Sequence, residues 1–485
     1  MRKKILLFLG ISLLLLTHLQ AQTLNEVQGT GSGVNITSGD YNTMYGDSSG
    51  ANITSGSYNT NIGFATGFNS LTSSENTNIG YKAGFNNLTG SDNVMIGFQA
   101  GYYNTDTDNT FVGNAAGYNN INGSDNTFIG EKAGARVTSG DDNTFIGAAA
   151  GNASGFIGIG TAPTTIPTTG SDNTAVGSSA GANLTTGYRN AFFGNEAGYD
   201  TTTGYRNTFI GDSAGLDLSV GHHNTMIGQA AGAATEYANY NTFVGALAGW
   251  DNNRTNSTSN ANRNTFVGIK NGSSNREGED NVGLGAFASF GDSGQNNPSS
   301  TTVGDRNNLS RATFIGANAD AGNNDVTLIG YSSRVDGQYG IAVGNDSDVL
   351  GTGAIGIGYL SSIATAGSNS VGIGREVNID NLQAIAIGSN SIAQANGTIV
   401  LGYGATSTDP GALLPTNNIA IGYSANVQGN NSVAIGNAAT AVNDNTMVLG
   451  GVTNPLSVGI GTDTPNPNAS LDLADTNKGL QINRL

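Results

Sequence analysis

The sequence lacks cysteine and has little proline and few charged residues, and each scarcity excludes something. Without cysteine, no disulfide bond can stiffen the chain. Only 8 of the 485 residues are proline, and charged residues make up 11%, under half of the roughly 25% usual in globular domains. The chain must therefore gain its rigidity in a way that needs neither disulfide bonds nor many ion pairs.

The few charges are mostly of one sign. The chain has 35 Asp and Glu against 18 Lys and Arg, a formal net charge of −17. A polyanion is repelled by nucleic acid and by anionic membrane surfaces. We therefore expect no nucleic-acid partner.

Long hydrophobic runs are also absent after the first 21 residues. Arg2, Lys3 and Lys4 precede an apolar stretch over residues 5–16, and Ala21 offers a small residue for cleavage before Gln22. This apolar stretch is shorter than the roughly 20 residues of a membrane-spanning helix. The pattern predicts a secretory signal peptide over 1–21 and a secreted or cell-surface protein of a Gram-negative bacterium, with no integral membrane segment after cleavage.

What the chain has in abundance is glycine, 74 residues, placed at regular intervals. The element Asn-Thr-x-Ile/Val-Gly-x-x-Ala-Gly recurs, for example as NTFIGEKAG over 126–134 and NTFIGDSAG over 207–215. Its first glycine recurs mostly every 17 residues up to Gly285. From Gly316 onward the step is mostly 14 residues, around elements such as NSVAIG over 431–436. A period this short excludes helical repeats, which run to about 33 residues or more.

A unit of this length fits one coil of a β-solenoid, with two short strands and two turns. Thr127 and Ile129 share one strand face and Phe128 lies on the other, as do Val433 and Ile435 around Ala434. Glycine closes each strand where the chain turns. About 25 coils spaced by roughly 4.8 Å would form a rod of roughly 120 Å. The fold class is thus predicted as an all-β parallel β-roll or β-solenoid, whose coils are stable only through their neighbours.

Each coil contributes an Ile or Val to an apolar ladder and an Asn whose side chain can bond along the stack. We take as repeat-core residues Ile79, Ile96, Ile129, Ile146, Ile210, Ile227, Ile387, Ile421 and Ile435. Both strand faces carry apolar residues, so one face fills the interior of the roll and the other must be shielded from water by something outside the coil. The spacing does not decide which face is which. Self-association as a homotrimer is the expected cover.

The change of period suggests a division of the chain. The predicted segments are a signal peptide (1–21), an N-terminal linker (22–33), a solenoid of 17-residue repeats (34–290), a second linker (291–311), a solenoid of 14-residue repeats (312–451) and a C-terminal connector (452–485).

The segment NNIAIGYSANVQGNNSVAIGNAATAVNDNTMVLG, residues 417–450, closely resembles the head repeats of trimeric autotransporter adhesins of the YadA type. The resemblance implies a left-handed parallel β-roll that trimerises side by side, and an adhesive function. It covers 312–450 closely; the 17-residue unit over 34–290 is similar to a variant in exported fibre-like proteins of the Bacteroidetes. The tail VGIGTDTPNPNASLDLADTNKGLQINRL lacks the stalk and barrel anchor of these adhesins, so we expect a fibre protein without that anchor, or a truncated reading frame.

Catalytic chemistry finds little support. His222 and His223 are adjacent and expected to point apart, a poor metal site beside the alternative of a solvated turn. Asp141 with Asp142, or Asp346 with Asp348, could form an acid pair or bind calcium, but solvated acidic turns are the simpler interpretation. GFIGIGTAP over 155–163 lacks the GK[ST] of a phosphate loop. We expect no enzyme, no metal and no cofactor.

Two columns of side chains bear on the function. The aromatic column consists of Phe68, Phe85, Tyr102, Tyr118 and Tyr199. It could face a glycan or a host or environmental matrix protein, or pack against neighbouring coils. A threonine column at Thr43, Thr60, Thr77, Thr110, Thr127 and Thr144 raises ice binding, although each Thr shares a face with Ile and is expected to be partly buried. We expect a fibrous adhesin-like protein for attachment or matrix assembly; the alternatives are an ice-binding β-solenoid and a phage-tail-fibre-like rod.

Overall fold

The computed structural model describes residues 24–152, 168–253, 260–290, 309–408 and 417–474. Within these residues the secondary structure is β-strand and turn, with no helix. The chain divides into two compact units, Met1–Glu279 and Asp280–Leu485. The predicted signal peptide (1–21) and most of the predicted linker 291–311 lie outside the described residues.

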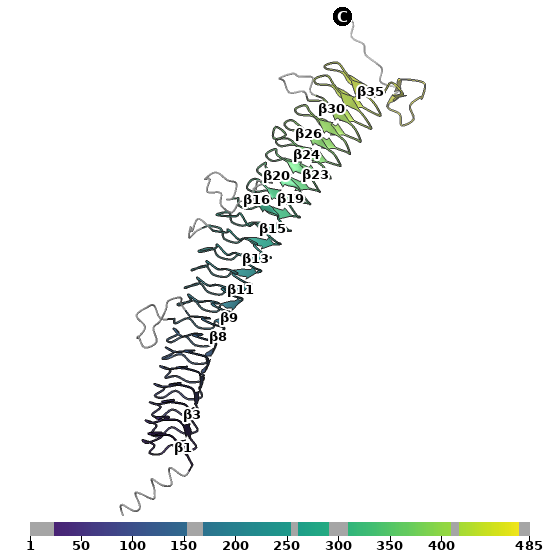
Figure 1. Ribbon diagram of the computed structural model, residues 1–485. Coiled ribbons are helices and arrows are strands. Elements are labelled where there is room, and N and C mark those ends of the chain that lie inside the picture. The colour runs from purple at the N-terminus through teal and green to yellow at the C-terminus, as the bar shows by residue number, and fades with distance from the viewer. Residues whose placement is uncertain (1–23, 153–167, 254–259, 291–308, 409–416, 475–485) are drawn as a thin grey trace, which may run out of the picture. The chain divides into compact units, whose positions relative to one another are not determined.

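The first unit is a stack of coils, each with one three-residue strand on the same side (Figure 1). All successive strands pair in parallel and in register up to β14, for example Phe128 of β7 opposite Phe145 of β8. The strands are β1 (Glu26–Gln28), β2 (Thr43–Tyr45), β3 (Thr60–Ile62), β4 (Thr77–Ile79), β5 (Val94–Ile96), β6 (Thr110–Val112), β7 (Thr127–Ile129), β8 (Thr144–Ile146), β9 (Thr174–Val176), β10 (Ala191–Phe193), β11 (Thr208–Ile210), β12 (Thr225–Ile227), β13 (Thr242–Val244) and β14 (Thr265–Val267).

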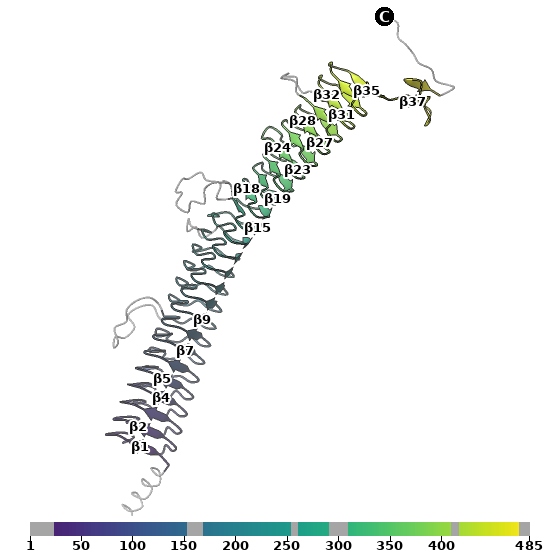
Figure 2. The same cartoon turned by 45° about the vertical axis from the view of Figure 1, so that its right-hand side comes forward.

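The second unit carries two parallel ladders, one of three-residue strands and a 10-stranded one of two-residue strands (Figure 2). The first ladder is β15 (Val282–Leu284), β17 (Thr313–Ile315), β19 (Thr327–Ile329), β21 (Ile341–Val343), β23 (Ile355–Ile357), β25 (Val371–Ile373), β27 (Ile385–Ile387), β29 (Ile399–Leu401), β31 (Ile419–Ile421), β33 (Val433–Ile435) and β35 (Met447–Gly451). The second is β16 (Ser289–Phe290), β18 (Asp320–Ala321), β20 (Arg334–Val335), β22 (Asp348–Val349), β24 (Ser362–Ile363), β26 (Asn378–Ile379), β28 (Ile392–Ala393), β30 (Thr406–Ser407), β32 (Asn426–Val427) and β34 (Thr440–Ala441). β36 (Asn454–Pro455) pairs antiparallel with β35, and β37 (Val458–Ile460) pairs parallel with β38 (Leu471–Leu473).

The predicted all-β parallel solenoid is confirmed, with two differences in detail. Two strands per coil occur in the second unit, whereas the other side of each 17-residue coil is built of turns. Backbone hydrogen bonds still join these turns from coil to coil, as from the Asn52 N–H to the Phe68 carbonyl, and one isolated parallel bridge forms between Val137 and Thr168. In addition, β1 lies within the predicted linker 22–33 and pairs with β2, so coil stacking begins before residue 34.

The two units divide at Glu279 and Asp280, earlier than the change of period suggested. β15 opens the first ladder of the second unit by pairing with β17, and β16 opens the second ladder by pairing with β18. The coil that contains β15 therefore already has the two-strand architecture, although its sequence follows the 17-residue pattern.

The interior of the first unit is filled by the middle residue of each strand. Phe128 is fully buried and stacks on Phe111 and on Phe145, with ring centroids 5.1 Å apart in both cases. Ala133 lies buried in the same coil. Each buried phenylalanine removes a large apolar surface from water, worth about 1.5–3 kcal/mol. Stacking identical coils therefore creates a continuous core that no single coil possesses.

Two glycines of each 17-residue coil are required by geometry, as Gly130 and Gly134 illustrate. Gly130 has a φ of +138°, and a Cβ there would lie 2.4 Å from the carbonyl oxygen of Gly147 in the next coil. Gly134 has a φ of +56°, and its Cβ would lie 2.5 Å from the Phe128 ring. The glycine period that defines the repeat thus marks positions where a side chain would block the stacking of coils or the packing of the core.

Buried asparagines continue the stack beside the core, as the sequence predicted. The Oδ1 atom of Asn126 accepts hydrogen bonds from the backbone N–H and from Nδ2 of Asn143, at 3.0 and 3.1 Å. Nδ2 of Asn126 donates to the carbonyl of Gly140 at 2.8 Å. Because each asparagine binds backbone groups of the next coil through both its acceptor and its donor, the ladder fixes the register of successive coils.

The thinner coils of the second unit match small residues against large ones. The middle residues of the three-residue strands include Ala342 and Gly356, while Val349 and Ile363 of the two-residue strands fill the interior from the other side. A Cβ on Gly356 would lie 2.6 Å from a methyl of Val349. This size matching allows a coil of 14 residues to close around a filled interior.

Candidate interaction surfaces

The first candidate surface is the outer face of the strands, and here the sequence-based placement of the repeat-core isoleucines has to be corrected. The repeat-core isoleucines do not lie in the interior of the chain. Ile129, Ile146 and Ile387 are 38%, 36% and 39% exposed, and the others of the set are exposed or half-buried, namely Ile79, Ile96, Ile210, Ile227, Ile421 and Ile435. Since strand residues alternate between faces, the burial of the middle residue turns its two neighbours outward.

This outer face combines threonine and aliphatic side chains in parallel columns. In the first unit most strands place a half-buried Thr first and an Ile or Val third, as in Thr127 and Ile129 of β7 and Thr144 and Ile146 of β8. The register holds these columns opposite each other from strand to strand. The result is a regular stripe, half apolar and half hydroxylated, that the single chain leaves exposed.

The aromatic column predicted from the sequence forms in part. Phe68, Phe85, Tyr102 and Tyr118 stack in order, with ring centroids 5.0, 5.1 and 5.2 Å apart. Tyr118 is only 4% exposed, and burial raises the pKa of Tyr102 above its usual value. Most of this column is therefore packed between coils.

Tyr199, the fifth member, does not join that stack. Its backbone carbonyl accepts a hydrogen bond from Asn183 in the coil before, where the equivalent position is Ala182. The coil after it has Leu216 there. An aromatic ladder needs an aromatic residue in every successive coil, and here the repeat supplies aliphatic residues on both sides.

Exposed aromatic stacks at other positions of the repeat were missed from the sequence, and two of them lie in the first unit. Phe64, Tyr81 and Phe98 stack at 5.5 and 5.0 Å and are 41–50% exposed. Tyr41 and Tyr58 stack at 5.0 Å and are more than half exposed. Aligning every position of the repeat, rather than only the one after Ala-Gly, would have found them.

The stacked geometry limits what these columns can bind. Rings whose planes are nearly parallel, as in Phe68 and Phe85 at 4°, cover each other's faces and present mainly edges to solvent. Sugars are usually held against the face of an aromatic ring, so the columns are poorly suited to stack on a glycan. The contacts favour the interpretation of these residues as packing between coils.

His222 and His223 do not point apart as expected. His223 has a left-handed φ of 57°, which breaks the alternation of a strand, and the two Nδ1 atoms are 2.9 Å apart. Burial, and then the neighbouring His223, lowers the pKa of His222. The pair continues a stack of Tyr188 and Tyr205, and Arg206 lies 3.3 Å from His223 Nε2. Within the described residues, no group of three or more His, Cys, Asp or Glu could hold a metal ion.

The two acidic pairs also have structural surroundings. Asp141 accepts a hydrogen bond from the backbone of Ser124 in the coil before, and Asp142 is exposed. Asp348 is half-buried on β22, opposite Arg334 of β20, while Asp346 lies in the preceding turn. Burial raises the pKa of Asp348, although the attraction of Arg334 opposes the rise.

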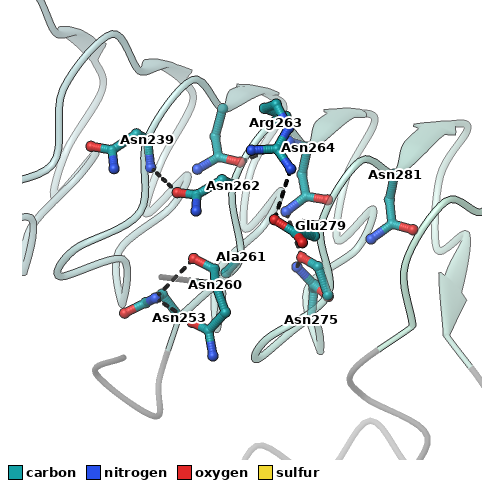
Figure 3. A network of polar contacts seen from close by, with 12 residues as sticks. Asn239, Asn253, Asn260, Ala261, Asn262, Arg263, Asn264, Asn275, Glu279 and Asn281 are labelled. Carbon is teal, nitrogen blue, oxygen red and sulfur yellow. Dashed lines mark hydrogen bonds and ion pairs between the residues drawn. The ribbon is translucent and has the colours of Figure 1, made fainter. Parts of the chain in front are cut away.

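The residue before each ladder asparagine forms a column that we call the charged column. In the first unit every member has a left-handed φ near 60°, and from Tyr58 onward the backbone N–H of each donates a hydrogen bond to the coil before. From Glu75 to Asp172 its members are acidic in six successive coils, namely Glu75, Asp92, Asp108, Asp125, Asp142 and Asp172. The following members are Arg189, Arg206, His223, Tyr240 and Arg263. Figure 3 shows the basic end, where Arg263 pairs with Glu279 at 2.8 Å beside the Asn239–Asn262 hydrogen bond.

No protein-family model and no curated protein matches the chain. The part of the chain that the structure describes also contains no helix long and apolar enough to cross a bilayer.

Proposed function

We propose that this chain is an exported fibrous protein with an adhesive or matrix-building role, assembled as a trimer through the outer face of its strands. The observation that carries the proposal is the exposed stripe of threonine, isoleucine and valine side chains. Contiguous apolar surface of this kind marks a site of association. A single chain buries one face of its strands. The other face, which carries an exposed Ile as the third residue of strands such as β7, β8 and β27, is left without cover.

The remaining parts of the proposal come from the sequence. The N-terminal residues have the pattern of a signal peptide, and the 14-residue repeats resemble the heads of trimeric autotransporter adhesins. A stack of repeated coils suits a protein that spans distance and presents a surface. A matrix protein or glycan in the environment or on a host is the proposed binding partner.

Sedimentation velocity tests the assembly. A chain of 49.1 kDa before signal cleavage should sediment with the mass of a trimer. The double substitution Ile129→Asp and Ile146→Asp should convert the trimer to a monomer, because charged groups at the centre of an apolar interface are strongly destabilising. The matched control is Ile121→Asp, which changes an equally exposed isoleucine (38%) outside the strands.

A monomeric wild-type chain, or a trimer that survives the double substitution, would contradict this assembly. Adhesion is tested separately, by the binding of the purified protein to collagen, fibronectin, glycan arrays and partner cells. Binding that disappears in the Ile121→Asp control as well would argue against the strand face as the surface that matters.

A second candidate, ice binding, is favoured by the same columns. Thr127 is half-buried and shares its strand face with Ile129, as expected, and this shared face is the outer one. A Thr–Ile array on the outer face of a parallel sheet repeats at about 4.8 Å along the stack, which gives a regular surface. Thermal hysteresis of the monomer tests it. Freezing-point depression that is lost in Thr127→Tyr would favour ice binding over the trimer.

A further inference from the structure

We propose that two copies of this chain dock antiparallel along the charged column, with the acidic run of one copy against the basic run of the other. The partner is a second copy of this chain, and the surface is defined by the residues before the ladder asparagines from Asp92 to Arg263. It uses side chains outside the strands, so it does not depend on the trimer proposed above.

The acidic run concentrates negative charge along one column of the first unit. Its six members occupy successive coils and are all exposed, with Asp172 47% exposed even beside Arg189. Carboxylates about 5 Å apart repel each other by roughly 1 kcal/mol per neighbouring pair in water, before screening. The fold does not require acids here, because Tyr41, Tyr58 and Arg206 occupy the same position with the same left-handed φ.

The basic run follows directly in the same column. Arg189 lies 3.4 Å from Asp172, and this ion pair marks the boundary between the two runs. Arg189 and Arg263 keep half or more of their side-chain surface exposed, and Tyr240 is 55% exposed. Two neighbouring runs of opposite sign thus share one face of one unit.

This order is self-complementary under one kind of symmetry. A two-fold axis that is perpendicular to the stack and lies in the interface places each column against itself in reverse order. With the axis between Asp172 and Arg189, the opposed pairs are Asp172 with Arg189, Asp142 with Arg206, Asp125 with His223, Asp108 with Tyr240 and Asp92 with Arg263. Four pairs join an acid to a basic residue, and the Tyr240 hydroxyl can donate to Asp108. The symmetry repeats all five, which gives ten contacts.

Parallel docking has the opposite result. A two-fold axis along the stack places Asp142 against Asp142 and Arg206 against Arg206, so every contact between two charged members repels. The charges therefore select the antiparallel orientation, and long-range attraction between opposite runs favours the encounter.

The neighbouring column fits the same arrangement by size. The residues one position earlier are small beside most of the acidic run, such as Ser124 and Ser171, and large beside the basic run, such as Tyr188 and His222. The same two-fold axis places Tyr188 opposite Ser171 and His222 opposite Ser124. Large side chains thus meet small ones across the interface.

Sedimentation velocity of the full chain in 20 mM and 500 mM NaCl tests the pairing. Individual surface ion pairs are weak and screened by salt, so ten together should double the sedimenting mass at low salt and dissociate at high salt. The variants are D125K/D142K/D172K and R189E/R206E/R263E. Each alone should lose the doubling, with at least tenfold weaker association, because three of its five opposed pairs then join residues of like charge. An equimolar mixture of the two should recover it.

The orientation is measured on the wild-type background, which has no native cysteine to interfere. Spin labels at Ser171→Cys, beside the symmetry axis, should lie within about 20 Å of each other, whereas labels at Ser74→Cys should be about 50 Å apart. Short distances at both sites would mean parallel docking and overturn the proposal. It is also overturned if either charge variant still doubles, if folded variants fail to pair when mixed, or if calcium rather than a second copy neutralises the acidic run and the mass never doubles.

Discussion

At the scale of single residues, the fold depends on backbone positions that tolerate only particular side chains. Gly130 combines a φ of +138° with a carbonyl oxygen of the next coil at the place of its missing Cβ. Other corners use left-handed φ values at non-glycine residues, such as Asp125 and Lys132 in neighbouring turns. The difference is space: a side chain at these two corners can leave toward solvent, and one at Gly130 cannot.

We predict that Gly130→Ala lowers the thermal midpoint of unfolding markedly. The backbone strain at this φ amounts to roughly 1–3 kcal/mol, and the contact with Gly147 adds to it. Gly31→Ala is the matched control, since Gly31 also has a positive φ (+73°) but its Cβ would meet only the Ser48 hydroxyl, at 3.8 Å. Circular dichroism during heating measures both. Equal losses in the two variants would show that the close approach contributes nothing.

Asp348 gives a prediction that depends on pH. Its pKa is raised by burial, so the ionised carboxylate is less stable in the folded chain than in the unfolded one. The resulting loss of stability is present at neutral pH and disappears as the pH falls below the carboxyl pKa of the unfolded chain, about 3.9. Asp348→Asn should therefore raise the thermal midpoint at pH 7 and have little effect near pH 3. A benefit that grows on acidification would contradict this sign.

At the scale of elements, neighbouring coils are joined by three kinds of column: backbone pairing of strands, stacked phenylalanines and the asparagine ladder. Phe128 and Asn126 belong to the same coil and contact both neighbouring coils. Every column repeats at the spacing of the strands, so a side chain that stacks in one coil stacks in the next. Each of these side chains therefore contacts its equivalents in both the coil before and the coil after.

We predict that Asn126→Ala destabilises the chain by roughly 1–3 kcal/mol. The substitution removes the acceptor of the Asn143 backbone and side chain and the donor to Gly140, all of them buried. The control is Asn69→Ala in a ladder at the surface, where Asn52 and Asn86 can bond water instead. Chemical unfolding measures the difference. A loss at Asn69 as large as at Asn126 would refute the role assigned to burial.

At the scale of the whole molecule, stability is a sum over neighbouring coils rather than a property of one compact core. The first coil, which contains the exposed strand β1, has a neighbour on one side only in the described structure, whereas the coil of β7 is covered by β6 and β8. In a solenoid each coil gains most of its stability from such neighbours.

Amide hydrogen exchange should therefore be slowest in the central coils of the first unit and fastest in β1, in proportion to the number of neighbours that each coil has. Mass spectrometry of exchanged peptides measures it, with β7 and β8 as the internal reference. Exchange that is uniform over the first unit would show a single cooperative transition instead.

The period, the parallel strands, the turns and the asparagine ladder were all predictable from the sequence, because a repeat that stacks in register must place equivalent residues in columns. Ile129 and Phe128 show where that reasoning ends. Both are apolar and adjacent, so alternation alone separates the two strand faces without saying which is inside.

Only the tertiary structure decided that question. Phe128 and Ala133 are buried in the interior of the coil, where the missing side chain of Gly134 leaves room for the Phe128 ring, and Ile129 on the opposite strand face points outward. The sequence by itself thus determined that the chain is a stack of β-coils. The direction of each side chain, and with it the exposed Thr–Ile face, the His222–His223 contact and the charged column, followed from how the corners turn and how closely the coils pack.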